Sequence, residues 1–193
     1  AEQAGLQPRI RHLGNSGTAW TQTDWTDELI RSGIAVYGLT PGAQLGTVQD
    51  LGIKPAMTLR ARLAHVKRVP AGTRVSYGGV WEAQRPTCVG LVPVGYADGI
   101  PRAAGGLIDV AVSGRRVPIV GRVAMDQFVI DLGPDATERA GDEVVLFGPG
   151  DQGELTADEW ADRLGSIGYE VITRIGPRVP REYREGGVPW LST

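Results

Sequence analysis

Hydrophobic and polar positions divide this sequence into two parts. From about Met57 onward, short apolar runs such as "MTLRARLAHVKRV", "TCVGLVPVG" and "GDEVVLFG" alternate with turn signals. In "IDVAVSGRRVPIVG" the alternation is close to period two around "SGRR", which predicts two strands joined by a hairpin turn. We therefore expect the larger part of the chain to be an antiparallel β domain.

Residues 1–50 have a different pattern. "AEQAGLQP" is typical of the last turn of a helix that stops at Gly5, and "TAWTQTDWTDE" can form one or two helical turns. "RIRHLGNSG" and "LIRSGIAVYGL" predict two strands that end in, or are interrupted by, small residues. Strands in series of this kind predict the end of an α/β unit. The expected fold class is mainly β, with an α/β remnant before an antiparallel β domain.

A helical pattern is predicted near the C-terminus. In "TADEWADRLG", Thr156 followed three positions later by Glu159 forms a capping box, and Gly165 is a typical stop signal. We expect a helix of about ten residues between them. The segment "RIGPRVPREY" is marked by prolines and is expected to be extended.

The composition argues against several classes of function, including nucleic-acid binding and membrane-spanning proteins. The 193 residues are 41% hydrophobic, enough for a normal core, and the net charge of −2 gives no reason to expect nucleic acid or an anionic membrane as a partner. No apolar run approaches the ~18 residues that a membrane span needs, and no secretion leader is visible. Cys88 is the only cysteine, so an internal disulfide and a cysteine-rich metal site are excluded, no metal-ligand spacing is present, and a reducing cytoplasm is expected.

Several short motifs carry residues suited to chemistry. In "RHLGNSG", His12 and Ser16 taken alone fit a core histidine and a helix cap. Arg31 lies among apolar neighbours and must be paired, exposed or held against a ligand, because burying a bare guanidinium costs several kcal/mol. Tyr96 in "PVGYADGIPR" fits a plain Gly-Asp turn, or a phenol that a loop presents between two glycines.

In this order and spacing, the motifs "RHLGNSG", "IRSGIAVYGL", "VPVGYADGIPR", "PIVGRVAMDQFVIDLG" and "IGYEVITRIGPRVPREY" resemble the C-terminal part of alanine racemase. That family consists of fold-type III enzymes that use pyridoxal 5′-phosphate. An eight-stranded α/β barrel of the TIM type holds the cofactor, and a mostly β domain follows it. The resemblance implies that residues 1–50 are the last two barrel strands with their loops, and that residues 51–193 are the β domain.

The resemblance also implies a set of cofactor-binding residues. Ser16 and the backbone at Gly33 and Ile34 would bind the phosphate, and Tyr169 would add a phenolic hydrogen bond. This location agrees with the phosphate sites that barrels form after strands 7 and 8. N–H groups and hydroxyls can hold a dianion without any lysine.

Arg31 would face the pyridine nitrogen of the cofactor, and His12 would hydrogen-bond Arg31 to fix its orientation. An arginine is effectively never deprotonated, so it keeps that nitrogen unprotonated and weakens the ring as an electron sink. A weaker sink shortens the life of the carbanion, which suits racemisation and suppresses transamination.

Racemisation needs two bases on opposite faces of the cofactor. The family uses the Schiff-base lysine and a tyrosine from the partner subunit, here Tyr96, which needs cationic neighbours because a phenol titrates near ~10. The glycines beside it would allow close approach to the other protomer, and Asp98 would brace the turn. The backbone N–H at Met125 would bind the substrate carboxylate across the dimer interface, with Asp126 beside it. Arg122 and Ile167 match family positions that line the entrance to the site. Tyr77 also belongs to the family pattern, and we expect it to pack.

The Schiff-base lysine of the family is not matched in this chain. Lys54 and Lys67 are the only lysines, they lack the motif, and both are expected to be solvated surface charges. We therefore expect the chain to need the missing N-terminal barrel half, and the isolated chain not to racemise alanine. The resemblance also implies a homodimer, because the family shares each site between two subunits. Two other readings stay open: a broader-specificity racemase acting on serine or lysine, and a non-catalytic β interaction module.

Overall fold

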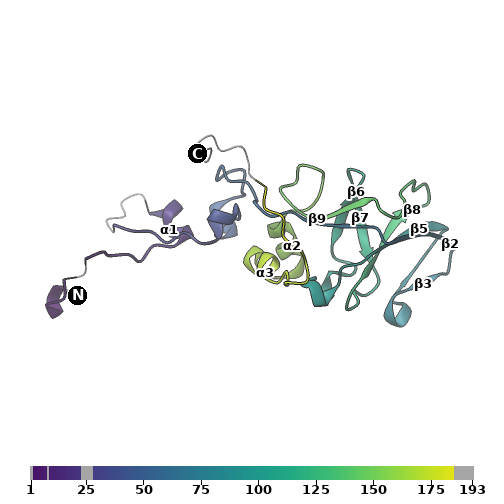
Figure 1. The fold of residues 1–193 in the computed structure, drawn as a ribbon, viewed down its shortest axis with the longest axis horizontal. Helices are drawn as coiled ribbons and strands as arrows, with labels where there is room; N and C mark the ends of the chain where they lie inside the picture. The colour runs from purple at the N-terminus through teal and green to yellow at the C-terminus, as the bar shows by residue number, and fades with distance from the viewer. Residues whose placement is uncertain (1, 8, 23–27, 185–193) are drawn as a thin grey trace.

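The computed structural model describes residues 2–7, 9–22 and 28–184. Its main sheet is antiparallel throughout and has the strand order β1-β9-β6-β7-β8-β5-β2 (Figure 1). The strands are β1 (Leu59–Arg62), β2 (His65–Val69), β5 (Thr87–Val92), β6 (Asp109–Val112), β7 (Arg115–Val120), β8 (Phe128–Gly133) and β9 (Glu143–Phe147). A separate ladder joins β3 (Arg74–Val75) to β4 (Trp81–Glu82). The predicted antiparallel β domain is confirmed.

The β6–β7 hairpin is confirmed, but its turn is shorter than predicted. Val112 pairs with Arg115, so that only Ser113 and Gly114 form the turn. Both have positive φ, 51° and 75°, as a two-residue type I′ turn requires. Arg116, assigned to the turn from the sequence, pairs with Ala111 inside the ladder instead.

Helix α2 (Ala157–Leu164) covers one end of the sheet and follows the predicted signals. Thr156 and Glu159 form the capping box, and Gly165 adopts the left-handed conformation that ends the helix. Its Trp160 is completely buried and donates an indole hydrogen bond to the carbonyl oxygen of Leu146 at 2.9 Å. A second helix, α3 (Gly168–Thr173), follows directly and was not predicted.

The described residues of the N-terminal part, 2–7, 9–22 and 28–37, form an arm that extends away from the sheet (Figure 1). It contains 3-10 turns at Glu2–Ala4 and Ile34–Tyr37 and the short helix α1 (Ser16–Thr21). The predicted strand "LIRSGIAVYGL" is wrong: within the described chain this region has a single parallel bridge, between Gly14 and Ile30. A parallel strand needs hydrogen-bonded neighbours along its length, and one bridge leaves the backbone free to turn into the 3-10 segment.

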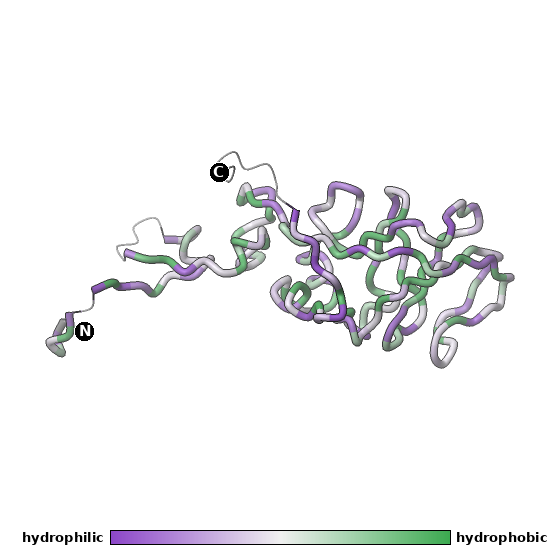
Figure 2. Tube along the Cα trace, in the orientation of Figure 1, coloured by the Kyte–Doolittle hydropathy of each residue, from purple (hydrophilic) through white to green (hydrophobic). Residues whose placement is uncertain are grey.

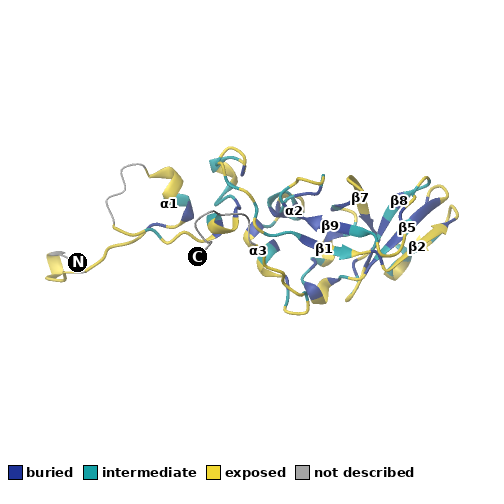
Figure 3. Ribbon diagram, turned by 45° about the horizontal axis from the view of Figure 1, so that its top comes forward, coloured by how far each residue is buried: buried dark blue, intermediate teal, exposed yellow. Residues whose placement is uncertain are grey.

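The arm joins the β domain through buried apolar contacts. Ile34 and Leu39 belong to the same hydrophobic cluster as the strands and Val171 of α3. A third 3-10 turn, Ala43–Leu45, lies in the following segment. Beyond this junction the arm is mostly exposed although it carries apolar residues, whereas strands β5, β6 and β9 are largely buried (Figures 2 and 3). No helix among the described residues is long and apolar enough to cross a membrane.

Candidate active site

Tyr96 lies in a tight turn after strand β5, at the edge of a cavity. The turn spans Tyr96–Asp98 and ends at Gly99, whose φ is 112°. Tyr96 is 44% exposed and lines a cavity of about 400 Å³ together with Ile100, Arg102 and Arg174. Its side chain is therefore not sealed in the β core, and it can meet a ligand.

The loop that carries Met125 lies directly against the Tyr96 turn. The amide of Tyr96 donates to the carbonyl oxygen of Ala124 at 3.0 Å, and the amide of Ala97 donates to that of Met125 at 2.9 Å. A Cβ atom at Gly95 would lie 2.3 Å from the Met125 oxygen, so only glycine permits this approach. The close contact that requires glycine is thus within the chain, whereas the sequence interpretation assigned it to the other protomer.

Acidic side chains and one arginine tie these loops together. Asp98 is buried and accepts a hydrogen bond from the amide of Gly95 at 2.8 Å, which confirms that it braces the turn. Arg178 contacts Asp98 at 3.3 Å and Asp126 at 2.7 Å. The hydrogen bond that Arg178 donates to Asp126 and the charges of both carboxylates raise the pKa of Arg178, so it stays charged. Sequence reasoning missed Arg178, because nothing local distinguishes it from the other C-terminal arginines.

Ser16, Gly33 and Ile34, which the resemblance assigned to the phosphate, lie together in the arm. The buried Ser16 oxygen accepts the amides of Gly33 at 2.8 Å and Ala35 at 3.3 Å. Its own hydroxyl hydrogen has no acceptor among the described residues, and the Ile34 amide likewise has no partner there. A buried donor without an acceptor fits an anion, so the residues present fit a phosphate group.

Arg31 and His12 are not paired in this structure. The amide of Arg31 donates to the carbonyl oxygen of Gly14 at 2.9 Å, but both side chains are exposed. Within the described chain no hydrogen bond joins the imidazole to the guanidinium, and the expected pairing stays a prediction for the completed site.

Tyr169 is the second residue of helix α3 and lines a groove of about 760 Å³ that residues 40–49 also line. In the same groove, Asp158 accepts a hydrogen bond from the amide of Thr40 at 3.2 Å, which fastens the arm to α2. Burial raises the pKa of Asp158 above 3.8, and the Thr40 hydrogen bond partly opposes this shift. Tyr169 therefore lies near the junction of the arm and the domain, and no hydrogen bond among the described residues joins it to Ser16, Gly33 or Ile34.

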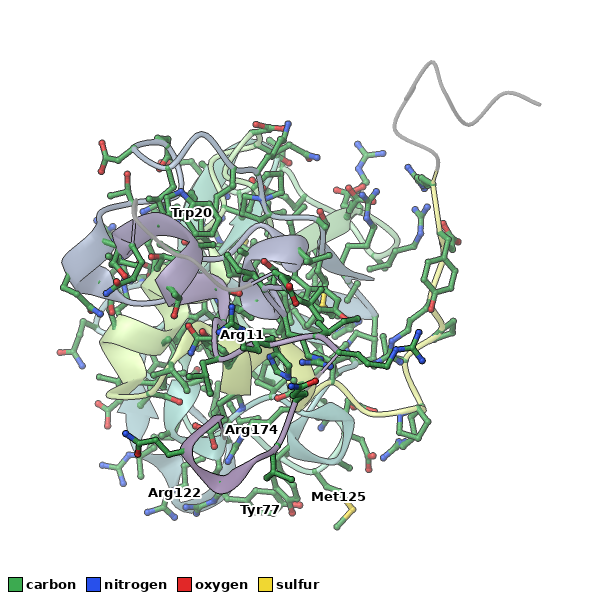
Figure 4. The ribbon with its side chains drawn as sticks, turned by 90° about the vertical axis from the view of Figure 1, so that its left-hand side faces the viewer. Arg11, Trp20, Tyr77, Arg122, Met125 and Arg174 are labelled. Atoms are coloured by element: carbon green, nitrogen blue, oxygen red, sulfur yellow. The ribbon has the colours of Figure 1, made fainter. Side chains whose placement is uncertain are left out.

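Three further positions assigned from the sequence lie at the surface. Arg122 and Ile167 are exposed, consistent with an entrance. Tyr77 was expected to pack, but it is 72% exposed, because the β3–β4 ladder turns it outward at the edge that also carries Met125 and Arg122 (Figure 4). In the described part of the chain, no group of three or more His, Cys, Asp or Glu side chains is arranged to hold a metal ion.

Comparison with known proteins identifies a family. The family model for the alanine racemase C-terminal domain matches residues 56–183. Alanine racemase from Streptomyces coelicolor is 54% identical over 95% of this chain and 46% of its own length, and that from Mycobacterium tuberculosis H37Rv is 50% identical over 96% and 48%. The crystal structure of alanine racemase from D-cycloserine producing Streptomyces lavendulae matches with a TM-score of 0.91 and 51% identity, covering 96% of this chain and 48% of that one.

The chain spans about half the length of the relatives that it matches. The match nevertheless extends over well over half of this chain and includes the turns that carry Tyr96 and Met125. The chain therefore belongs to the alanine racemase family, of which it contains the C-terminal domain.

Proposed function

We propose that this chain is the C-terminal part of an alanine racemase that interconverts L- and D-alanine with pyridoxal 5′-phosphate, in which Tyr96 transfers the α-proton on one face of the substrate. Residues 1–50 would belong to the cofactor-binding barrel and residues 51–193 to the β domain. The observation that supports the proposal is the contact between the Tyr96 turn and the Met125 loop, since it joins the turn that carries the phenol to the loop that carries a backbone N–H donor.

Met125 offers its N–H group to the substrate carboxylate. This amide has no hydrogen-bond partner among the described residues, and the residue is exposed. Asp126 follows it, and a carboxylate there would repel the substrate, but Arg178 contacts Asp126 at 2.7 Å and offsets its charge. The loop can therefore bind an anionic group next to an acidic residue.

Tyr96 holds and transfers the proton at its phenolic oxygen. Arg102 and Arg174 line the same cavity, and positive charge there stabilises the oxygen while the proton is away. Arg174 forms an ion pair with Glu170 at 3.0 Å, which offsets part of its charge. Arg102 is therefore the better of the two arginines for stabilising the phenolic oxygen. The Asp98 carboxylate accepts a hydrogen bond from the amide of Gly95 and so holds the turn in shape, which limits how far the phenol can move.

The arm supplies the cofactor contacts. The free hydroxyl hydrogen of Ser16 and the amide of Ile34 would donate to the phosphate, with Tyr169 adding its phenol, and the Arg31 guanidinium would face the ring nitrogen. When bound, pyridoxal phosphate supplies the electron sink that makes the α-proton acidic. His12 would orient Arg31 in the completed site.

Ser16, Gly33 and Ile34 form what we call the phosphate cradle. Within one chain, Tyr96 makes no hydrogen bond to this cradle among the described residues. Within the described chain the hydrogen bonds of residues 14–22 stay within residues 14–35, and α1 stands apart from the sheet (Figure 1). We therefore place Tyr96 at the cradle of a partner chain in a homodimer. Large apolar side chains are exposed along the arm, including Leu13 at 84%, and the remaining barrel half would cover them.

The isolated chain is expected to be inactive because neither of its two lysines lies where it could carry the cofactor. Lys54 forms an exposed ion pair with Asp151 at 2.7 Å. Lys67 is exposed on β2, an edge strand, where lysine discourages edge-to-edge aggregation. Neither contacts the cradle in the described structure, so the lysine that carries the cofactor belongs to the barrel half. The buried Cys88 fits a reducing cytoplasm.

The test compares Tyr96→Phe with Tyr183→Phe in the full-length protein. Tyr183 is 92% exposed and serves as the matched control. Loss of an acid–base group is expected to lower kcat about 10²–10⁴-fold in Tyr96→Phe, with no change in the control. Wild-type turnover by Tyr96→Phe, or conversion of L-alanine to D-alanine by residues 1–193 alone, would contradict the proposal. Rates with serine and lysine beside alanine test the specificity.

A further inference from the structure

The proposed phosphate donors lie on two separate elements of the chain. Ser16, Gly33 and Ile34 belong to the arm, whereas Tyr169 is the second residue of α3. The distance between the Tyr169 hydroxyl and the phosphate cradle therefore depends on how the end of the arm is fixed against α2 and α3.

The end of the arm is packed closely against the β domain. The carbonyl oxygen of Ile34 accepts the amide of Leu39 at 3.4 Å, and both residues are buried in the core. A Cβ atom at Gly38 would overlap the carbonyl oxygen of Lys54, so only glycine permits the chain to pass there. The buried Ile34 of the cradle is thus linked over a short stretch of chain to Thr40, which follows Leu39.

Asp158 connects this segment to both helices. Its Oδ2 atom accepts the amide of Thr40 at 3.2 Å, across 118 positions of the chain. Its Oδ1 atom lies against Gly168, the first residue of α3, where a Cβ atom would overlap it. Asp158 itself belongs to the first turn of α2. One side chain from α2 therefore contacts both the arm and the residue directly before Tyr169.

The junction is open beside this contact. Thr40, Asp158 and Tyr169 all line the groove of about 760 Å³, so side chains do not fill the space between them. Among the described residues, the bond from Thr40 to Asp158 is the only hydrogen bond that joins residues 28–50 to α2 or α3. The apolar contacts of the junction are non-directional, whereas a hydrogen bond has a preferred direction and length.

Holding a carboxylate at this junction costs free energy. Burial raises the pKa of Asp158, the Thr40 hydrogen bond partly opposes this shift, and the charge of Asp162 adds to it. Within the described chain, no lysine, arginine or histidine forms an ion pair with Asp158. The charge therefore adds little stability, and the two contacts of the side chain point to a role in geometry.

We infer that Asp158 is a positioning residue, which sets the separation between the Tyr169 hydroxyl and the phosphate cradle. This inference rests on the proposed function, in which both bind one phosphate group, and adds a residue to it. Asp158 acts through Thr40 on the arm and through Gly168 on α3. Donors that must converge on one anion need a fixed separation, because hydrogen bonds weaken steeply when their geometry is lost.

The experiment compares Asp158→Ala and Asp158→Asn in the full-length protein, with Asp162→Ala as the matched control. Asp162 lines the same groove, and its carboxylate makes no hydrogen bond or ion pair among the described residues. Both alanine variants remove one negative charge from the groove, so a difference between them isolates the bond to Thr40. The affinity of the apoprotein for pyridoxal phosphate, measured by fluorescence titration, should fall about 10-fold in Asp158→Ala and not in the control. Asp158→Asn keeps an oxygen for the Thr40 amide and should stay within about 3-fold of wild type.

Two further readouts separate positioning from a general loss of structure. Pyridoxal, which lacks the phosphate group, should bind Asp158→Ala and the wild type equally, whereas a damaged fold would weaken both ligands. Tyr169→Phe removes the phenolic hydroxyl, so Asp158→Ala should weaken pyridoxal phosphate binding less than about 3-fold in that background. Without any cofactor, hydrogen exchange of the Thr40 amide should be about 10-fold faster in Asp158→Ala and unchanged in Asp162→Ala.

Gly168→Ala provides a second variant if Asp158→Ala does not fold. Its new Cβ atom displaces the Asp158 carboxylate while the residue itself stays in place. We expect this variant to weaken pyridoxal phosphate binding about 10-fold as well, with the affinity for pyridoxal unchanged.

The outcomes separate the inference from the proposed function. If the wild-type protein racemises alanine but Asp158→Ala binds pyridoxal phosphate as Asp162→Ala does, the inference about Asp158 is wrong and the proposed function stands. Equal losses of affinity for pyridoxal and pyridoxal phosphate would also overturn the inference. If the wild-type protein does not racemise alanine, the proposed function is wrong, and the two titrations still decide whether Asp158 positions a phosphate site.

Discussion

Replacing Gly95 with alanine tests the contact on which the site depends. Gly95 has φ of −142° and ψ of −163°, which alanine adopts without strain. The obstacle is space, because the new Cβ atom would lie 2.3 Å from the carbonyl oxygen of Met125 and 2.4 Å from that of Ala124. Real Cβ contacts essentially never fall under 3.0 Å, so the two loops must separate.

The shift needed is roughly 0.7 Å, and it strains the bonds from the amides of Tyr96 and Ala97 to that loop. Overpacking of this kind, with two hydrogen bonds weakened, should lower the free energy of unfolding by about 2–4 kcal/mol. The phenol of Tyr96 would also move relative to the Met125 amide. We expect kcat to fall about 10–100-fold.

Urea unfolding of this chain measures the stability, and alanine racemisation by the full-length protein measures kcat. Gly165→Ala is the control, because it adds a Cβ atom at φ of 64° with nothing within 4 Å. That variant should lose about 1–2 kcal/mol from backbone strain and keep its activity. If Gly95→Ala behaves like Gly165→Ala in both assays, the reasoning from the Gly95 contact fails.

Three other predictions concern the cradle, the groove and the core. Ser16→Ala should weaken pyridoxal phosphate binding about 10-fold in the full-length protein, measured by fluorescence titration, and unchanged affinity would remove Ser16 from the cradle. Because the pKa of Asp158 is raised, the protein loses stability relative to Asp158→Asn as the pH rises above 3.8; urea unfolding over this range tests the sign, and the opposite trend would contradict it. Trp160→Ala should cost about 3–5 kcal/mol by urea unfolding, since it leaves a cavity and an unpaired Leu146 oxygen, and a loss under ~1 kcal/mol would refute this.

Local signals predicted the fold well where they act over a few residues. The capping box at Thr156, the stop at Gly165 and the hairpin centred on Gly114 all appear in the structure. The strand expected at "LIRSGIAVYGL" does not, because apolar residues specify a parallel strand only when neighbouring strands pair with it. Helix α3 was missed because its six residues are too few for a clear helical period.

The residues of the candidate site were predicted from sequence motifs, and the structure shows which of these motifs lie in contact. Ser16, Gly33 and Ile34 lie together, and so do Tyr96 and Met125, although the sequence alone gave no distances between them. The resemblance supplied the roles of these residues, and those roles stay predictions.

The sequence by itself determined the turns, the helix cap and the identity of the family, because glycine, capping residues and short motifs act within a few positions of each other. Only the tertiary structure decided that Arg178 contacts Asp126, 52 positions away, and that Gly95 leaves room for the Met125 loop. Contacts of this range depend on how strands pair and loops pack, and no local pattern of residues specifies that.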